Sequence, residues 1–403
     1  MKNGRYINQL SFILSMNLNL EEYNPWTKNL NYGIDRLFNY PEMVRAMRRK
    51  EIQVLSGIRR CGKTTLLRQC IRHLLDQGVL SKHILFIPCD EPLLKLKTYE
   101  DVHKIIEEFS INKKRIYVFL DEVQVINGWE KYVKGRYDAE APVKFFVSGS
   151  SASFFRKDVA SYLTGRHFFH KITTCNYEEY MRISPKGSLG DYLEWGGFPE
   201  VILEQDVRQK KLILQTYLET IIQRDIIDRY NLRNRKQIED FYKSILSVVG
   251  GKAVVKKLAL QFHSTERSIV RLILAGLDSF LLEDVTFFSH SLRKNRFQPS
   301  KIYPCDIGFT RLLTGRFERG RSAEWAVLKK ISPAQYWTNE GHEVDFVTRD
   351  LALQVTYTHE VSSREFDALV AFRKIFRISG VVLAISKTEK TESIEEFLTK
   401  NWA

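Results

Sequence analysis

A short loop bounded by glycines carries the residue types that bind a phosphate chain. It reads GIRRCGKT over residues 57–64, with the spacing G-x-x-x-x-G-K-T that starts at Gly57 and continues through Gly62. In such a loop, backbone N–H groups surround the phosphates, while Lys63 reaches the β and γ phosphates and the Thr64 hydroxyl ligates Mg²⁺. The loop therefore predicts a nucleotide-phosphate site.

The sequence on both sides of the loop agrees with this prediction. Residues 52–56 read IQVLS, which is typical of a buried strand, and residues 63–78 place apolar side chains at a helical period. A strand, a glycine loop and a helix in this order direct backbone N–H groups and the positive end of the helix at an anion. The same run contains three more candidate nucleotide contacts, Arg60, Cys61 and Thr65.

A pair of carboxylates follows a second apolar run. Residues 116–120 read IYVFL and lead directly into Asp121 and Glu122. At the end of a buried strand, Asp121 suits an outer-sphere contact to Mg²⁺, and Glu122 is placed to polarise an attacking water. This pair favours hydrolysis of the nucleotide over binding alone.

Hydroxyl groups end a third apolar run. Residues 143–147 read VKFFV and precede Ser148 and Ser150, either of which is a candidate sensor of the γ phosphate or the water. Ordinary turn chemistry explains these serines nearly as well. Together with residues 84–88, these runs alternate with helical segments as in an α/β fold with a parallel sheet, where ligands gather at the carboxyl ends of the strands.

Seven segments in order resemble one protein family. They read SGIRRCGKTTLL, VFLDEVQVINGWE, FFVSGSSA, LTGRHF, WGGFPE, RDIIDRYNLRN and KIYPCDIGF. From about residue 30 to the end, the chain resembles prokaryotic AAA-type P-loop ATPases. The resemblance implies ATP binding and hydrolysis by a P-loop NTPase core. It also implies a winged-helix region and a C-terminal domain of unknown function with a restriction-endonuclease-like fold.

The resemblance also carries residue roles onto this chain. It supports phosphate and metal binding by the loop, metal and water contacts by Asp121 and Glu122, and sensing by Ser148 or Ser150. Arg166 in LTGR and Arg224 in QRD fall on family motifs, and either could complete a site in cis or from a neighbouring subunit. A structural salt bridge explains each arginine at least as well.

The expected domain organisation follows from length and motif order. A chain of 403 residues exceeds one ordinary core. We expect a P-loop ATPase core with an N-terminal extension to about residue 30, a helical connecting or lid region, a winged-helix-like region and a degenerate nuclease-like α/β domain. These occupy residues 1–175, 176–236, 237–305 and 306–403.

The winged-helix prediction depends on three helical segments followed by a ribbon. The helices are expected over 235–251, 253–265 and 266–285, with extended chain at 286–291 and 301–306 around a basic loop at 293–296. The third segment is so apolar that we expect much of it to be buried, which leaves Arg267 and Arg271 to reach a phosphate. Two interpretations remain open: contact with DNA, or packing within the chain or against a subunit.

The C-terminal domain lacks part of a nuclease site. Glu324 and Asp345 fit the first two carboxylate positions of a restriction-endonuclease-like site, but Gln354 and Thr356 stand where an acid and a lysine belong. Because carboxylates hold Mg²⁺ and the lysine assists the attacking water, we expect the fold without the catalyst. Glu343 or Glu360 would have to substitute.

Net charge, cysteine content and hydropathy indicate which classes of partner and which cellular environment the chain suits. There are 62 Lys and Arg against 48 Asp and Glu, a net charge of +14, which makes an anionic partner such as nucleic acid plausible, although solubility alone also explains it. Five scattered cysteines indicate neither a zinc site nor disulfides and fit a reducing cytosol. No apolar run of ~18 residues suggests a membrane span. WGGFPE (195–200) is expected to be a tight interdomain turn.

The function expected from the sequence is Mg-dependent ATP binding and hydrolysis by a cytoplasmic protein. Nucleotide state would drive or switch the interdomain arrangement and thereby regulate a macromolecular partner, either another protein or a second copy of the chain. The first alternative is an ATP-regulated DNA-binding protein that uses the winged helix. The second is a metal-dependent nuclease.

Overall fold

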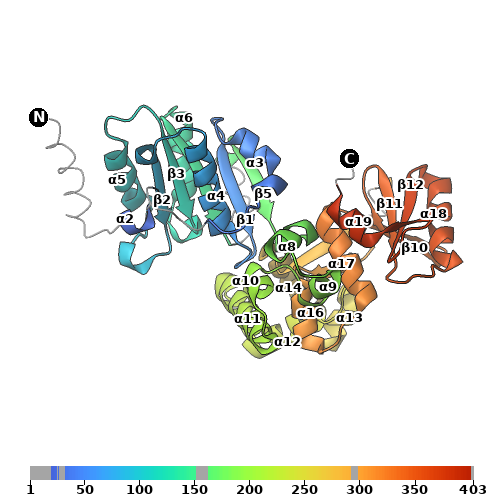
Figure 1. Ribbon diagram of the computed structural model, residues 1–403. Helices are drawn as coiled ribbons and strands as arrows, with labels where there is room; N and C mark the ends of the chain where they lie inside the picture. Colours follow the sequence, from blue (N-terminus) through green and yellow to red (C-terminus); the bar gives the residue numbers. More distant parts are fainter. Residues whose placement is uncertain (1–19, 25, 27–31, 151–161, 292–297, 401–403) are drawn as a thin grey trace, which may run out of the picture. The chain divides into compact units, whose positions relative to one another are not determined.

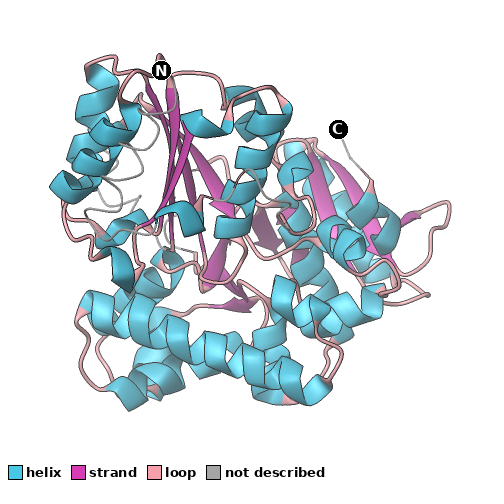
Figure 2. Ribbon diagram, turned by 60° about the vertical axis from the view of Figure 1, so that its left-hand side comes forward, coloured by secondary structure: helices cyan, strands magenta, loops and turns pink. Residues whose placement is uncertain are grey.

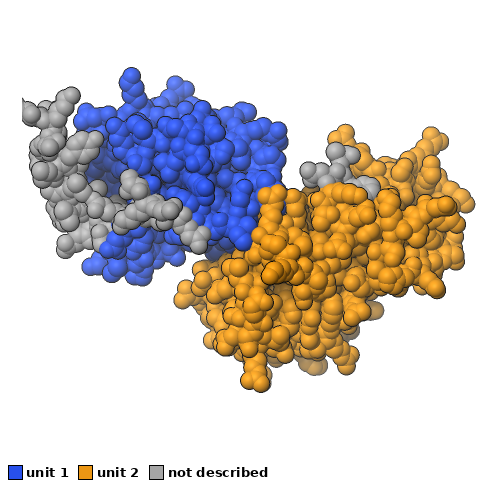
Figure 3. All heavy atoms as spheres, in the orientation of Figure 1, with its two compact units in different colours: residues 1–57, 62–172 blue, residues 58–61, 173–403 orange. Residues whose placement is uncertain are grey.

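The computed structural model describes residues 20–24, 26, 32–150, 162–291 and 298–400 (Figure 1). The chain divides into two compact units (Figure 3): unit 1 contains residues 1–57 and 62–172, and unit 2 contains residues 58–61 and 173–403. The stretch 58–61 is the middle of the predicted phosphate loop, so the loop contributes residues to both units. The basic loop expected at residues 293–296 lies outside the described residues.

Unit 1 is built on a parallel five-stranded sheet of order β2-β3-β4-β1-β5 (Figure 1). The strands are β1 Ile52–Gly57, β2 Ile84–Pro88, β3 Ile116–Asp121, β4 Val143–Gly149 and β5 His167–Ile172. The predicted α/β fold with a parallel sheet is thus confirmed. Because parallel strands share one carboxyl edge, the loop after β1 and the ends of β3 and β4 meet there.

Alternate side chains of these strands serve the two faces of the sheet. Val118 and Val147 belong to a core shared with α5 (Tyr99–Ser110) and α6 (Trp129–Asp138). Phe119 and Phe146 alternate with those valines, and their rings stack with centroids 4.4 Å apart on the other face. The period of two in the apolar runs therefore places helices on both faces.

Helix α4 (Lys63–Asp76) follows the loop and contacts β1, β3 and β4. Its buried Gln69 donates to the carbonyls of Tyr32 and Ile34 and accepts from Arg36 N–H, which holds the preceding segment in place. The shorter elements of unit 1 are α2 Leu20–Tyr23, η1 Leu37–Asn39, α3 Pro41–Ala46, η2 Ser81–His83, η3 Pro92–Leu94 and η4 Val123–Val125.

From residue 173 onwards, unit 2 begins with helices. Helices are drawn in cyan in Figure 2. One of them, α11, runs directly into a π-helical segment, η6. The helices are α8 Tyr177–Ile183, α9 Leu189–Trp195, α10 Pro199–Leu203, α11 Val207–Thr220, η6 Ile221–Asp228, α12 Arg235–Leu246, α13 Val255–Gln261, α14 Glu266–Asp278, α16 Ile307–Thr314, α17 Arg319–Ile331, α18 Ser363–Phe376 and α19 Ile394–Thr399.

An eight-stranded mixed sheet organises the rest of unit 2, in the order β13-β12-β11-β10-β9-β7-β8-β6. The antiparallel group β6-β8-β7 joins the C-terminal group through parallel pairing of β7 with β9. The strands are β6 Gly251–Lys252, β7 Leu282–Phe287, β8 Lys301–Pro304, β9 Gln335–Asn339, β10 His342–Val347, β11 Leu351–Val355, β12 Ser379–Ala384 and β13 Thr391–Ser393. α12, α13 and α14 precede β7 and β8, while β6 lies between α12 and α13 in the sequence and joins the same antiparallel group.

The third of those helices is shorter than the prediction. α14 ends at Asp278, and Phe280 takes a positive φ of 58°. The apolar run then continues into strand β7, in which Leu282, Val285 and Phe287 are buried. Within α14, Ile269, Ala275 and Gly276 are buried as expected, whereas Val270 and Leu274 are 42% and 54% exposed.

The WGGFPE segment lies within unit 2, so the expectation of an interdomain turn is wrong. Gly196 has φ 80° and ends α9, where a side chain would strike Asp306. Gly197 N–H donates to Asp306 Oδ2 at 2.8 Å, and Gly308 N–H donates to Oδ1 at 3.0 Å. Pro199 occupies the first position of α10, where a missing N–H costs nothing. The segment therefore surrounds a buried carboxylate that caps α16.

Candidate functional site

The predicted phosphate loop leaves β1 through a glycine that has no room for a side chain. A Cβ on Gly57 would lie 1.8 Å from the Ile172 carbonyl oxygen on the paired strand β5. At the other end, Gly62 has φ 95° and forms the N-cap of α4. Both glycines are therefore required by the backbone path, as expected for a loop that presents N–H groups to an anion.

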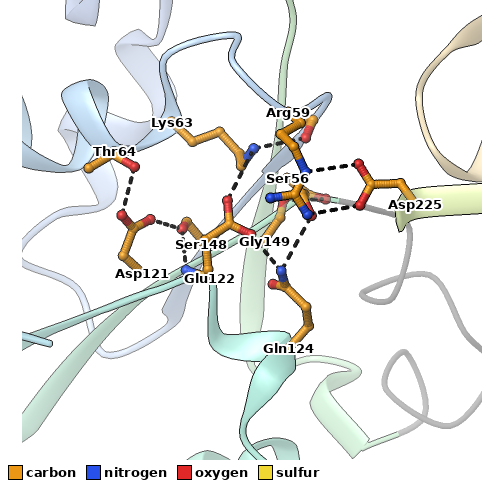
Figure 4. A network of polar contacts seen from close by, with 12 residues as sticks. Ser56, Arg59, Lys63, Thr64, Asp121, Glu122, Gln124, Ser148, Gly149 and Asp225 are labelled. Atoms are coloured by element: carbon orange, nitrogen blue, oxygen red, sulfur yellow. Dashed lines mark hydrogen bonds and ion pairs between the residues drawn. The ribbon is translucent and has the colours of Figure 1, made fainter. Parts of the chain in front are cut away.

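Lys63, the first residue of α4, folds its side chain back against the phosphate loop. Its side chain is 3% exposed, and Nζ donates to the Gly57 carbonyl at 3.1 Å. The same Nζ is 3.6 Å from Glu122 Oε1 (Figure 4). A buried ammonium held between a loop carbonyl and a carboxylate is positioned as a fixed positive charge at the strand edge.

Thr64, Asp121 and Ser148 form a hydrogen-bonded chain across α4, β3 and β4 (Figure 4). Thr64 Oγ1 donates to Asp121 Oδ2 at 2.6 Å, and Ser148 Oγ donates to Oδ1. Burial raises the pKa of the Asp121 carboxyl, while both hydroxyl donors oppose that rise. The arrangement brings together a hydroxyl and a carboxylate, which are both ligand types that Mg²⁺ accepts.

Glu122 adopts a left-handed conformation, with φ 51°. Its backbone N–H donates to Ser148 Oγ at 3.1 Å, so one serine contacts both acidic residues. Gln124 Nε2 donates to Glu122 Oε2 and also lies 3.3 Å from Ser150 Oγ. Positive φ in a non-glycine residue is a strained geometry that clusters at functional sites.

Gln124 is a site residue that the sequence reasoning missed. The local signal is its place two residues after Glu122, in the middle of η4. The two serines also separate in role: Ser148 contacts Asp121 and the backbone of Glu122, whereas Ser150 contacts Gln124. Ser56 Oγ, at the end of β1, donates to the Gly149 carbonyl at 3.4 Å.

The structure does not bring Arg166 to this edge of the sheet. Arg166 immediately precedes β5, which starts level with Ile52 at the amino end of β1. Its Nε donates to Asp138 Oδ1 at 2.6 Å, and this contact lowers the pKa of Asp138 to about 2. Arg166 is therefore about 20 Å from the loop along the strand, given ~3.3 Å per residue. Arg224 is exposed on η6 of unit 2.

The middle of the loop contacts helices of unit 2. Arg59, another residue that the sequence reasoning missed, forms an ion pair with Asp225 of η6 at 3.0 Å. The Arg60 guanidinium lies 5.6 Å from the centre of the Tyr217 ring on α11, and Arg60 has φ 69°. Cys61 is fully buried, and Thr65, on α4, is partly exposed.

A second group of charged residues lies in the C-terminal sheet. Glu324 and Asp345, the two carboxylates singled out in the sequence, are buried, with 8% and 6% of their surface exposed. Lys301 of β8 is buried between carboxylates, with Nζ 2.6 Å from Glu343 Oε1 and 3.8 Å from Asp345 Oδ1. The lysine that the pattern lacks at position 356 therefore has a counterpart in space, because Lys301 comes from a strand 44 residues earlier than Asp345.

Asp345 has a perturbed environment. Burial, reinforced by the nearby Glu324, raises the pKa of Asp345 to about 8, although Lys301 opposes the shift. Oδ2 accepts from Val355 N–H at 2.9 Å, and Gln354 Oε1 accepts from Asp345 N–H at 3.3 Å. Among the described residues, no group of three or more His, Cys, Asp or Glu side chains is arranged to hold a metal ion.

Family models match two segments of the chain. Residues 49–181 match an AAA domain, and residues 186–319 match a domain of unknown function, DUF8612. The first segment contains the phosphate loop, Asp121, Glu122 and Ser148. The same segment also contains all five strands of the parallel sheet.

The relatives are themselves without assigned functions. An uncharacterized protein of Methanocaldococcus jannaschii, MJ1544, is 26% identical over 348 residues, 78% of this chain and 76% of that protein. A second, MJ1637, is 28% identical over 225 residues, 54% of this chain and 44% of its own length. An uncharacterized protein of Haemophilus influenzae is 28% identical over 193 residues, 45% of this chain and 48% of that protein.

Two solved structures resemble part of the chain weakly. A DNA replication initiation factor has 16% identity and a TM-score of 0.29, with 62% of this chain and 95% of that chain covered. AMPPCP-bound DnaA from Aquifex aeolicus has 14% identity and a TM-score of 0.33, with 61% and 89% covered. Scores this low carry no argument about function.

No helix in the described ranges is both long and apolar enough to cross a bilayer. Residues 49–181, which carry the candidate site on a parallel five-stranded sheet, are similar to an AAA domain.

Proposed function

We propose that unit 1 binds ATP with Mg²⁺ and hydrolyses it. The observation that carries this proposal is the connected set at one edge of the parallel sheet, in which Lys63 approaches Glu122 and Thr64 bonds Asp121. A glycine turn that only packed a helix on a sheet would need none of these four side chains. The AAA-domain match over residues 49–181 supports the choice of ATP.

The residues present fit a nucleotide and a divalent cation. Gly57 and Gly62 permit the backbone path of the loop, and Lys63 would supply positive charge for the outer phosphates. Thr64 Oγ1 and Asp121 would hold Mg²⁺, directly and through water, in the arrangement usual for P-loop enzymes. Bound Mg²⁺ would neutralise charge on the phosphates during transfer of the γ phosphoryl group.

Glu122 is the proposed general base. Its carboxylate is anchored on one side by Gln124 Nε2, and its backbone is anchored by Ser148 Oγ. Held in this way, Oε1 accepts a proton from a water at the sheet edge while Lys63 stabilises the carboxylate. Gln124 and Ser148 position the base and do not themselves exchange the proton.

We further propose that nucleotide state switches the conformation of the chain and so regulates a macromolecular partner. The domain boundaries expected from the sequence, and a winged-helix assignment for α12 to β8, belong to this proposal. DNA is the alternative partner: Arg267 and Arg271 are exposed on α14, and the chain carries +14. DNA-stimulated ATP hydrolysis that disappears at high salt would favour that alternative.

The decisive experiment is steady-state ATP hydrolysis by the purified full chain. Lys63→Ala should lose ATP binding and turnover, and Glu122→Gln should lose turnover while ATP stays bound, because only the base is removed. Glu239→Gln, which removes one end of an exposed ion pair on α12, serves as the control with unchanged activity. A wild-type chain that binds no ATP, or a Glu122→Gln variant that still turns over, contradicts the proposal.

A further inference from the structure

Arg59 of the phosphate loop is held by a two-point ion pair. Its Nε donates to Asp225 Oδ2 at 3.2 Å and Nη2 donates to Oδ1 at 3.0 Å (Figure 4). The Arg59 and Asp225 side chains are 24% and 6% exposed. A bidentate guanidinium–carboxylate pair fixes orientation as well as distance, and partial burial protects it from screening.

Asp225 is a buried acid. It lies in the π-helical segment η6, where Ile221, Ile222, Ile226 and Ile227 are also buried. A buried carboxylate is costly unless a cation and hydrogen bonds compensate it, and Arg59 supplies both. π-Helical turns recur at functional sites because they re-aim side chains that a regular helix would place elsewhere.

A second contact of the loop involves the helix that precedes η6. Arg60 lies over the Tyr217 ring of α11, and Tyr217 Oη donates in turn to Glu200. Arg59 and Arg60 are consecutive, and Arg60 has a strained positive φ. Two adjacent loop residues are therefore fixed on one continuous helical stretch, Val207–Thr220 with Ile221–Asp228.

We propose that Asp225 is a positioning residue for ATP binding, and that the α11–η6 stretch senses whether the phosphate loop holds nucleotide. This inference rests on the proposed function. The same few residues that present backbone N–H groups to the phosphates carry the Arg59 anchor, so Asp225 preorders the loop for its ligand. Because coupling between sites is reciprocal, ATP must in turn stabilise η6.

The first test is a double-mutant cycle on ATP affinity in the full chain, followed with a fluorescent ATP analogue. Asp225→Asn and Arg59→Gln should each weaken ATP binding by about tenfold. The double variant should lose no more affinity than the single variant with the larger loss, because both substitutions remove the same contact. Asp225→Glu, which keeps the charge, should recover part of the loss. Arg235→Gln, at an exposed ion pair elsewhere in unit 2, should bind as wild type does.

The second test is hydrogen exchange of residues 221–228 with and without ATP. Wild type should show slower exchange with ATP, and the Arg59→Gln, Asp225→Asn double variant should lose that response while remaining folded, because neither partner is left as a buried lone charge. Additive losses, tighter binding by Asp225→Asn, or exchange that ignores ATP in wild type would overturn the inference.

The two proposals fail in different ways. If wild type and Lys63→Ala both bind no ATP, the proposed function is wrong and the inference is lost with it. If wild type binds ATP, Lys63→Ala does not, and Asp225→Asn binds like wild type, only the inference fails. A melting curve for each variant separates loss of binding from loss of fold.

Discussion

At the scale of single residues, Ser148 contacts both acidic residues of the candidate site, whereas the sequence suggested only that it senses the γ phosphate or the water. It bonds the Asp121 carboxylate and receives the Glu122 N–H, whereas Ser150 contacts Gln124. We expect Ser148→Ala to lower the turnover of ATP about ten- to a hundredfold, because a positioning contact of this kind orients both acids. Steady-state kinetics would measure it.

Ser150→Ala is the matched comparison, since it removes a hydroxyl from the same turn. Its effect on turnover should be smaller, and ATP affinity should change little in both variants. Equal losses in the two variants would show that the Ser148 contacts do not distinguish it from its neighbour.

Asp345 makes a prediction about pH. Burial raises the pKa of its carboxyl to about 8, so the folded chain keeps a proton that the unfolded chain has released above the ordinary carboxyl range. Folding stability contributed by this group therefore falls as pH rises from about 4 to about 8, by up to ~1.4 kcal/mol per pH unit. Asp345→Asn should flatten that dependence.

Urea unfolding of the full chain across this pH range, followed by a probe in unit 2, measures the effect. Asp350→Asn, at an exposed turn residue just before β11, is the control and should keep the wild-type slope. A wild-type slope that survives in Asp345→Asn would mean that Glu324, or another buried acid, carries the proton instead.

At the scale of elements, the local pieces of the site were predictable and the connections between them were not. The loop, the Asp121–Glu122 pair and the strand before Ser148 are each encoded within a dozen residues, by apolar period and glycine placement. Lys301 beside Asp345 and Arg59 beside Asp225 join residues 44 and 166 positions apart. Pairings of that range depend on strand order and helix packing, which no local pattern specifies.

The end of α14 illustrates the same limit at shorter range. The apolar run continues past Asp278 without a break in composition, yet Phe280 turns left-handed and the chain enters β7. A continuous apolar run is compatible with a helix or a strand, and sheet pairing with β8 decides between them.

A substitution at Gly57 tests whether the packing of β1 against β5 also fixes the position of the phosphate loop. A Cβ there would meet the Ile172 carbonyl of β5 at 1.8 Å, so Gly57→Ala forces the two paired strands apart. We expect a loss of about 1–3 kcal/mol in the free energy of unfolding, together with weaker ATP binding as the loop moves.

Gly135→Ala is the control for that substitution. Gly135 lies within α6, and an added Cβ meets nothing within 4 Å. Alanine there should leave ATP binding unchanged and raise stability by about 0.5–1 kcal/mol through its better helix propensity. Denaturant titration of both variants measures the difference, and a Gly57→Ala chain as stable as wild type would contradict the close approach.

At the scale of the whole molecule, the two units have separate hydrophobic cores, one around the parallel sheet and one around the mixed sheet. We therefore expect two transitions in calorimetry. ATP with Mg²⁺ should stabilise unit 1 by about 2.7 kcal/mol when the free nucleotide is at 100 times its dissociation constant. Lys63→Ala should remove that shift.

Whether ATP also shifts the calorimetric transition of unit 2 decides whether nucleotide binding affects the stability of unit 2. Residues 58–61 belong to unit 2 while the rest of the loop belongs to unit 1, and Arg59 is anchored on η6. If the loop transmits its state through that anchor, ATP also raises the transition of unit 2, and Asp225→Asn restricts the stabilisation to unit 1. An ATP shift confined to unit 1 in the wild type would mean that the ion pair holds the loop without reporting on it, because a ligand stabilises only the structure whose free energy depends on the bound state.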